Sequence, residues 1–363
     1  MAERVYGTRT LIDRGDITAM RTDDAGDPPA PEKGQALFRI QRVAITANNV
    51  TYAAFGEQMG YWRFFPAPDG SGILPVWGYA ECTASKAKGL SKGDRFYGYW
   101  PLAEYLLCET DRVDSTGFVD PSEHRQGLAD VYNRYERRPK DGERMDEVIE
   151  SLLRPLWVTG WLIGRSLTSA SDFGAEQIVM SSASSKTGYS CAWELARREP
   201  DEAVETIGLT SPGNLAYTQS LGLYDRVVAY NDLESLSADR PTVYVDFAGS
   251  TDLRARVHTH FGSRLGRSIA VGATQWEEMD QSRTVPPPEA KMFFAPDVIK
   301  DQMQTHGRDA FARVNAAAWA DFAEWVRPHI DLRTLGSLTE AADAYRGLAT
   351  GTLGGAAGII AEY

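Results

Sequence analysis

The sequence predicts an α/β protein with two domains, one rich in β-strands and one built on a doubly wound parallel sheet. The first observation is length, because 363 residues suffice for about two domains of ordinary size. The second is that residues 1–110 contain short strand-like runs separated by turns, and the third is that strands and helices alternate after residue 155. Such alternation is typical of right-handed βαβ units that form a parallel sheet.

The strand-rich part contains the runs 36–46 (ALFRIQRVAIT) and 93–100 (GDRFYGYW). Both combine apolar, aromatic and β-branched residues in the way that partly buried strands do. Turn-forming residues recur between them, namely Pro66, Pro68, Gly70, Gly72 and Pro75. We therefore expect a compact β-rich domain with irregular loops.

Residues 110–150 differ in character, since they are charged and poor in apolar residues. A charge run of this kind is most often a solvated surface, so we expect a surface insertion or lid. The segment 152–163 is densely apolar and fits a helix that enters the second domain.

The second domain is expected to alternate strands and helices before a long helical segment. The strands are expected at 177–181, 203–209, 226–230, 242–246 and 268–272, and the helices at 187–197, 214–221 and 252–261. The long helical segment covers about 297–327, and the tail from residue 338 holds a helix and a closing strand at 357–363.

Composition restricts the class of function. Hydrophobic residues make up 43% and charged residues 24%, which are globular values and exclude a disordered or coiled-coil protein. The formal net charge is −12, and no run of Lys and Arg occurs, which argues against a nucleic-acid partner. A local basic pocket for one phosphorylated cofactor is compatible with this charge.

Cysteine usage and the N-terminal segment predict an environment inside the cell. Cys82, Cys108 and Cys191 are odd in number, far apart and without a CxxC pair, so neither a disulfide framework nor a cysteine zinc site is expected. The first residues lack an apolar signal segment, and no run of 18 apolar residues occurs. We expect a soluble, cytoplasmic protein without a membrane partner.

The first strand-to-helix turn of the second domain is residues 181–188 (SSASSKTG). Small residues let the backbone approach a pyrophosphate, and the start of a helix offers N–H groups and a positive dipole end. The expected cofactor-binding residues of this turn are Ser184, Ser185, Lys186, Thr187 and Gly188. A P-loop is excluded because it needs glycines that Ser182 and Ser185 do not supply. The alternative for Lys186 is an exposed lysine in an ordinary capping sequence.

The second strand of this domain ends in residues 208–214 (GLTSPGN), without a carboxylate. NAD-selective sites place an acidic residue there to bind the ribose hydroxyls, so its absence favours NADP over NAD. Thr210, Ser211 and Asn214 are expected to donate hydrogen bonds to a 2′-phosphate. The alternative is an ordinary polar turn.

Short motifs occur in a fixed order along the chain. In the first part they are 47–51 (ANNVT) with Gly56, 75–80 (PVWGYA), 93–98 (GDRFYG) and 157–161 (WVTGW), and in the second part 211–214 (SPGN), 221–222 (LG), 230–231 (YN), 246–249 (DFAG) and 266–272 (GRSIAVG). Their order resembles the zinc-independent branch of the medium-chain dehydrogenase/reductase superfamily, with its quinone reductases and 2-enoyl reductases, and most closely an uncharacterised reductase-like family. The resemblance implies a GroES-like domain at 1–154 and 326–363, and a Rossmann domain at 155–325.

The same resemblance implies further site residues and a homodimer. The implied cofactor-binding residues are Tyr230, Phe247, Ala248, Gly249, Val271 and Gly272. Two departures concern the cofactor, because the glycine-rich fingerprint has become serine-rich and Asn214 replaces the lysine of the 2′-phosphate pocket. The zinc-ligand segments of alcohol dehydrogenases have no counterpart, and His258 and His260 are alternate residues of a helix that do not share a face. No metal is therefore expected.

A metal-free reductase needs hydrogen-bond donors for the enolate that hydride transfer produces. The resemblance places Asn48 and Thr51 on the segment that lines the nicotinamide pocket, with Tyr52 and Tyr61 close behind. We expect these four residues to be catalytic, with Tyr61 as the proton donor. The alternative is that Tyr61 and the aromatic residues near it only pack the core.

These observations predict an NADPH-dependent, metal-free reductase of an activated double bond or carbonyl compound. The expected substrate is an enone, enoyl or quinone-like small molecule that is apolar or aromatic. Two alternatives stay open. One is non-redox carbonyl chemistry on the same fold, such as carbon–carbon cleavage or hydration, through a tyrosine or Lys186. The other is a nucleotide-binding sensor without catalysis.

Overall fold

The computed structural model describes residues 4–68, 70–199, 204–271, 284–353 and 357–363. The chain divides into two compact units, which are described separately. Unit 1 comprises Met1–Arg154 and Ile330–Tyr363, and unit 2 comprises Pro155–His329. The second division therefore follows His329, whereas the resemblance implied a division after residue 325.

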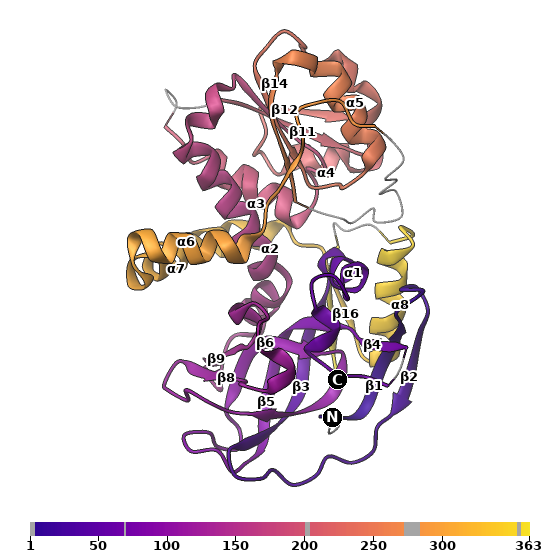
Figure 1. The fold of residues 1–363 in the computed structure, drawn as a ribbon, viewed down its shortest axis with the longest axis vertical. Helices are drawn as coiled ribbons and strands as arrows, with labels where there is room; N and C mark the ends of the chain where they lie inside the picture. Colours follow the sequence, from indigo (N-terminus) through magenta and orange to yellow (C-terminus); the bar gives the residue numbers. More distant parts are fainter. Residues whose placement is uncertain (1–3, 69, 200–203, 272–283, 354–356) are drawn as a thin grey trace. The chain divides into compact units, whose positions relative to one another are not determined.

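Unit 1 is built on a large, mostly antiparallel sheet (Figure 1). Its main path runs β2-β1-β7-β3-β5-β6-β9-β8, while β17 pairs with β3 and β16, and β4 pairs with β1. The strands are β1 (Val5–Asp13), β2 (Met20–Asp24), β3 (Gln35–Ile45), β4 (Ser71–Ile73), β5 (Pro75–Ser85), β6 (Arg95–Pro101), β7 (Ala103–Glu109), β8 (Gly117–Val119), β9 (Arg134–Arg138), β16 (Leu332–Leu335) and β17 (Gly358–Glu362). Its helices include α1 (Ala47–Ala54) and α8 (Leu338–Ala349). The predicted β-rich domain is confirmed.

Aromatic side chains fill the interior of unit 1. Phe38 on β3 lies 5.5 Å from Phe96, 5.4 Å from Trp100 and 5.2 Å from Phe118, measured between ring centroids. All four rings are fully buried. Aromatic residues suit the pleated surface of a sheet, where rings from neighbouring strands meet edge to face or offset. The core of this unit therefore lies between β3, β6 and β8.

The charged segment 110–150 is not wholly a surface insertion or lid, because it supplies strands β8 and β9 to this sheet. Strand β8 pairs with β9, and β9 pairs with β6. On β9, Tyr135 is fully buried, while Arg138 forms an ion pair with Glu150 at 2.6 Å. Alternate residues of a strand face opposite sides, so one charged run can supply both core side chains and ion pairs.

Unit 2 contains a parallel sheet with the strand order β12-β11-β10-β13-β14-β15. The strands are β10 (Gln177–Met180), β11 (Glu205–Thr210), β12 (Arg226–Ala229), β13 (Thr242–Asp246), β14 (Leu265–Ala270) and β15 (Lys291–Met292), and the helices are α2 (Arg144–Ser169, which begins before the division), α3 (Lys186–Leu195), α4 (Leu215–Ser220), α5 (Thr251–Phe261), α6 (Ala295–His306) and α7 (Arg308–Val326). From β10 the chain first adds β11 and β12 on one side of it, and it then adds β13, β14 and β15 on the other side. The predicted doubly wound sheet is confirmed, with its switch in strand order beside β10.

Different helices cover the two faces of this sheet. Ile178 and Met180 of β10 pack with residues of α2 and α3, whereas Val179 packs with residues of α5. Successive side chains of a strand point to opposite faces, and a parallel sheet is covered on both. Ligands of such sheets bind at the carboxyl ends of the strands.

Helices α2 and α3 approach each other closely at two glycines. A Cβ atom on Gly160 would lie 2.4 Å from the carbonyl oxygen of Thr187, and one on Gly164 would lie 2.9 Å from Cβ of Glu194. Both distances are shorter than side chains tolerate, and the first involves the backbone at the start of α3. Because residues four apart share a helix face, both glycines serve the same contact. Helix α2 thus positions the first turn of α3.

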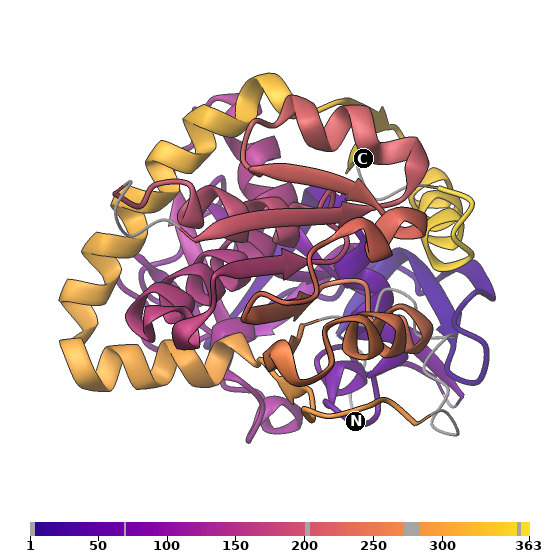
Figure 2. The ribbon, with the colours of Figure 1, turned by 90° about the horizontal axis from the view of Figure 1, so that it is seen from above.

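The helical segment expected at 297–327 is two helices separated by Gly307. This glycine has a φ of 86°, which is in the left-handed region. Figure 2 shows α6 and α7 running along the outside of unit 2. Phe322 attaches α7, since its ring lies 5.3 Å from that of Trp193 and 5.9 Å from that of Trp157. In the described part of the chain, none of the helices has the length and apolar character needed to span a bilayer.

Candidate functional site

Hydrogen bonds to neighbouring strands fix the turn that follows β10. Ser181 is fully buried, and its hydroxyl donates to Oδ1 of Asp246 at the end of β13, at 2.8 Å. The N–H of Ala183 donates to the carbonyl of Leu209 on β11 at 3.0 Å. Ser182 between them has a φ of 50°, a left-handed conformation that favours glycine. The turn therefore contains a backbone conformation typical of glycine at a position that holds a serine.

Helix α3 begins directly after this turn. Ser185 is its N-cap, and the hydroxyl accepts a hydrogen bond from the N–H of Gly188 at 3.1 Å. A Cβ atom on Gly188 would lie 2.8 Å from the carbonyl oxygen of Ser182, so this close approach requires glycine. Ser184 is buried and Thr187 is partly buried. The first-turn N–H groups and the positive end of the helix dipole make this helix start suitable for an anion.

Lys186 is the cationic group of the turn. The residue is only 6% exposed, so the alternative of an exposed lysine is wrong. Burial lowers the pKa of its ammonium from 10.5 to about 8, which leaves the group mostly charged at pH 7. A phosphate would favour the charged form and so offset the cost of burying it.

The end of β11 carries the polar residues that the sequence indicated. Thr210 is fully buried, and its hydroxyl donates to that of Ser184 at 3.3 Å, so it supports the turn after β10. Ser211 and Asn214 are partly exposed, at the two ends of the 3₁₀ turn Pro212–Asn214. Both residues lie just beyond the carboxyl end of β11, where ligands of such sheets bind.

Tyr230 comes directly after β12 and contacts the same turn. Its hydroxyl accepts a hydrogen bond from the N–H of Ser182 at 3.0 Å. Its carbonyl accepts a hydrogen bond from Arg256 of α5 at 3.1 Å. Burial raises the pKa of the Tyr230 phenol, while the hydrogen bond from Ser182 lowers it. The residue thus holds the turn from the side of β12.

The ends of β13 and β14 complete this edge of the sheet. Asp246 is fully buried, and its Oδ1 accepts hydrogen bonds from the N–H groups of Ala248 at 3.1 Å and Gly249 at 3.0 Å. The backbone here must turn sharply, and Gly249 has a φ of 76°. Phe247 is buried, and the N–H of Val271 donates to the carbonyl of Asp246 at 3.0 Å. The expected Gly272 lies outside the described residues.

A second group of expected residues lies in unit 1, on α1 and β5. Tyr52 is buried, and its hydroxyl accepts hydrogen bonds from Nδ2 of Asn48 at 2.7 Å and from Nε1 of Trp77 at 2.9 Å. With both lone pairs engaged, the hydroxyl keeps its own proton to donate. Thr51 is partly buried on α1, and no hydrogen bond among the described residues joins its side chain to Tyr52.

Three tyrosine rings lie around that of Tyr52, and one of them, Tyr99, is 5.3 Å away. Tyr61 begins the 3₁₀ turn Tyr61–Arg63, and its ring centroid lies 4.7 Å from that of Tyr52. The ring of Tyr132 lies 5.8 Å from that of Tyr61 and 6.2 Å from that of Tyr52. We call Asn48, Tyr52, Tyr61, Trp77 and Tyr132 the phenol cluster.

Burial controls the acidity of the phenol cluster. It raises the pKa of Tyr52, and it raises the pKa of Tyr61 by more than the neighbouring Tyr132 hydroxyl lowers it. Burial therefore keeps both phenols neutral at physiological pH, and a neutral phenol can donate a hydrogen bond. A neutral phenol that is held in place can stabilise a developing oxyanion or protonate it.

No motif in the sequence marks Tyr132 as a site residue. This tyrosine lies in the charged segment 110–150, which was interpreted as surface. The signal that could have found it is the pair Tyr132 and Tyr135 within a run of arginines and acids, because aromatic residues are unusual in a solvated lid.

Nothing in the described part of the chain offers a metal site, because no three His, Cys, Asp or Glu side chains gather there. His258 has structural partners on both ring nitrogens. Its Nε2 lies 2.9 Å from Oγ of Ser268, and its Nδ1 lies 2.6 Å from the carbonyl oxygen of Pro286.

The β-rich unit and the doubly wound unit make up a fold that is shared by solved structures of other proteins, among them the following three. CurA from Vibrio vulnificus in complex with NADPH is 10% identical with a TM-score of 0.60, and covers 98% of this chain and 99% of its own. Mycobacterial Rv1454c complexed with NADPH and the CurK enoyl reductase are each 13% identical, with TM-scores of 0.58 and 0.57 and the same coverages of 98% and 99%.

The chain belongs to the family described as "Protein of unknown function (DUF2855)", which matches residues 43–354. This confirms the resemblance to an uncharacterised family within the reductase fold. No curated protein matches the sequence.

Proposed function

We propose that this protein is a metal-free, NADPH-dependent reductase of an activated double bond or carbonyl compound. The observation that carries the proposal is the turn 181–188, where the buried cation Lys186 lies at the start of α3 in the first βα unit of a doubly wound sheet. CurA and Rv1454c, which share the fold, are both described in complex with NADPH. The sequence of β11 supports NADPH over NADH, because its end carries no carboxylate.

In this proposal, unit 2 binds the nucleotide. The small residues of the turn and the first N–H groups of α3 bind the pyrophosphate, with Lys186 supplying positive charge. Ser211 and Asn214 donate hydrogen bonds to the 2′-phosphate in place of the usual lysine. When bound, the nicotinamide supplies or accepts the hydride.

The phenol cluster supplies the proton. Tyr61 donates to the enolate, and Tyr52 holds Tyr61 in place while Asn48 and Trp77 fix the Tyr52 hydroxyl. Because hydroxyl donors stabilise the oxyanion, the reaction needs no Lewis-acid metal. The aromatic rings around Tyr61 favour an apolar or aromatic enone, enoyl or quinone-like substrate.

Binding of both nicotinamide cofactors to the purified protein tests this proposal. We expect NADPH to bind at least about tenfold more tightly than NADH, measured by the change in nicotinamide fluorescence. NADPH oxidation is then followed at 340 nm against a panel of enones, enoyl thioesters and quinones. Failure of both cofactors to bind overturns the proposal, while binding without turnover on any substrate favours a nucleotide sensor.

A second candidate is non-redox carbonyl chemistry through the amine of Lys186. The observation that favours it is the burial of this lysine, which lowers its pKa to about 8 and gives a neutral fraction at mildly alkaline pH. Borohydride added with a ketone or aldehyde would trap an imine on Lys186, detected by peptide mass. Such trapping together with absent NADPH binding would support this candidate over the reductase.

A further inference from the structure

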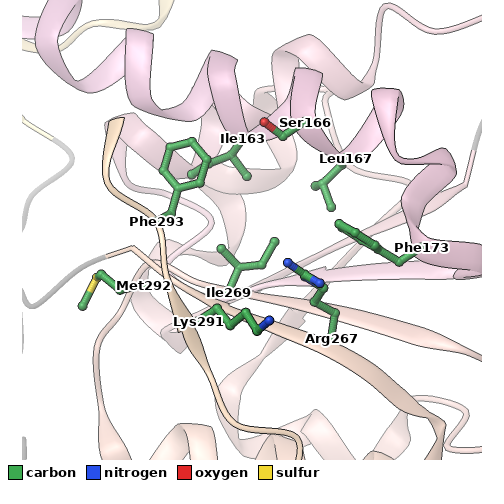
Figure 3. A pocket seen from close by; sticks show the side chains of 9 residues that line it. All are labelled: Ile163, Ser166, Leu167, Phe173, Arg267, Ile269, Lys291, Met292 and Phe293. Carbon is green, nitrogen blue, oxygen red and sulfur yellow. The ribbon is translucent and has the colours of Figure 1, made fainter. Parts of the chain in front are cut away.

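A pocket in unit 2 lies apart from the candidate cofactor turn (Figure 3). It has a volume of about 200 Å³ and is lined by α2, by the 3₁₀ turn Ser171–Gly174, and by strands β14 and β15. Its apolar wall consists of Ile163, Leu167, Ile269 and Phe293. None of its lining residues belongs to the turn 181–188, so the pocket is a separate feature of the unit.

Two cations line this apolar pocket. Figure 3 shows the guanidinium of Arg267 and the ammonium of Lys291 on the same side of it. Neither forms an ion pair with a described carboxylate. The Nε of Arg267 is buried and has no hydrogen-bond partner among the described residues. Two cations without an acidic partner among the described residues favour an anionic ligand.

The turn beside Arg267 holds an aromatic ring at the pocket. The Arg267 guanidinium lies 4.2 Å from the centroid of the Phe173 ring, which is 44% exposed. Ser171, Asp172 and Phe173 have φ values of 47°, 50° and 54°, although none is glycine. Left-handed residues in succession are strongly disfavoured for L-amino acids.

A buried ion pair maintains this strained turn. Asp172 accepts two hydrogen bonds from Arg198, at 2.7 and 2.8 Å, and both side chains are almost fully buried. Strained backbone persists only where the surroundings fix it, and it concentrates at binding sites. With this backbone conformation, the Phe173 ring lies against the guanidinium of Arg267 and is not buried in the core.

We propose that this pocket binds a small anionic amphiphile, namely a carboxylate with a short apolar tail. The tail packs against Ile163, Leu167 and Ile269. The carboxylate pairs with the guanidinium of Arg267 and with the ammonium of Lys291, the two cations that line the pocket. A volume of about 200 Å³ lies below the usual range for drug-sized ligands, so the occupant is no larger than a medium-chain acid. This inference does not depend on the proposed reductase activity.

Titration calorimetry of the full chain with octanoate tests the proposal. We expect saturable binding at one site, with octan-1-ol and octylamine binding at least about tenfold more weakly because they lack the negative charge. Arg267→Met and Lys291→Met should each weaken octanoate binding about tenfold or more. Arg264→Met is the matched control, since Arg264 is exposed, lies three residues from Arg267 and does not line the pocket. Its affinity for octanoate should be unchanged.

Several results would overturn the proposal. Equal affinity for octanoate and octan-1-ol would show an apolar cleft that ignores charge, and unchanged binding in both Met variants would remove the cations from the site. Lys291 is exposed, so Lys291→Met keeps the test valid if Arg267→Met unfolds. A protein that is a dimer in solution, with Phe173 and Met292 protected from hydroxyl-radical labelling and no octanoate binding, would show that a second copy covers the pocket.

Discussion

The turn 181–188 and the phenol cluster are two candidate sites of different construction. The turn is continuous in sequence, and its chemistry comes from backbone N–H groups, small side chains and one cation, Lys186. The phenol cluster brings together α1, the Tyr61 turn, β5 and Tyr132, which are far apart in the chain. A site made by one turn is visible in sequence, whereas a site made by packing depends on the whole sheet.

The phenol cluster gives the largest expected effect. In Tyr61→Phe, turnover of an enone should fall by about 10²–10⁴-fold because the proton donor is lost, while NADPH affinity is unchanged. Tyr52→Phe should lower turnover by a smaller factor, since it removes the support of Tyr61. Steady-state kinetics and fluorescence titration measure the two quantities. Tyr105→Phe on β7 is the matched control, and equal turnover in Tyr61→Phe and Tyr105→Phe would remove Tyr61 from catalysis.

For the turn, the corresponding change is Lys186→Met. Loss of one charged contact to phosphate should weaken NADPH binding by roughly 10–100-fold. Comparison with NADH shows which phosphate Lys186 contacts. If it contacts the 2′-phosphate, Lys186→Met weakens the binding of NADPH alone, and if it contacts the pyrophosphate, the variant weakens the binding of both cofactors. Lys33→Met, an exposed lysine of unit 1, controls for the change in net charge. Unaltered affinity for both cofactors in Lys186→Met would exclude this lysine from the cofactor site.

The lowered pKa of Lys186 gives the turn a pH dependence. Because a phosphate binds the ammonium form, NADPH affinity should decline as the pH rises through about 8, by at most about tenfold per pH unit. The stability of the protein without NADPH depends on pH in the opposite direction. The unfolded chain binds the proton more tightly, so this lysine adds stability as the pH rises from about 8 towards 10.5. Fluorescence titrations between pH 6.5 and 9.5 check the first effect, and Lys186→Met should abolish it.

The fold was largely predictable because both units follow local patterns. Alternation of strands and helices after residue 155 was enough for the parallel sheet, and the turn 181–188 was found from its place in the first βα unit. The error over residues 110–150 has a physical cause, since Arg138 counts as surface charge in sequence but, on β9, pairs with the buried Glu150 of α2. Tyr132 was missed for the same reason. The left-handed backbone of Ser182 was also unpredictable, because serine rarely adopts it.

A substitution at the contact between α2 and α3 tests whether the turn 181–188 depends on how these helices pack. Gly160→Ala would place a methyl group 2.4 Å from the backbone of Thr187, so it should destabilise the protein by about 1–3 kcal/mol and displace the start of α3. Gly266→Ala is the matched control, because its new Cβ would lie no closer than 3.9 Å to a neighbour. Chemical denaturation measures the stability, and NADPH titration reports on the turn. Equal stabilities of the two variants would show that the helices separate without cost.

The smallest expected effect concerns Ser182, where the turn departs from the glycine-rich fingerprint. Ser182→Gly relieves a left-handed conformation that costs roughly 1–2 kcal/mol for a residue with a Cβ atom. The greater freedom of glycine in the unfolded chain opposes this by about 0.4–1 kcal/mol, so the net gain in stability should be below about 1.5 kcal/mol. The hydrogen bond from the backbone N–H of residue 182 to the Tyr230 hydroxyl is retained, so NADPH affinity should stay equal or rise slightly. Weaker NADPH binding by Ser182→Gly would mean that the serine hydroxyl itself contacts the nucleotide. The turn would then bind through side chains, as the phenol cluster does, and not through its backbone alone.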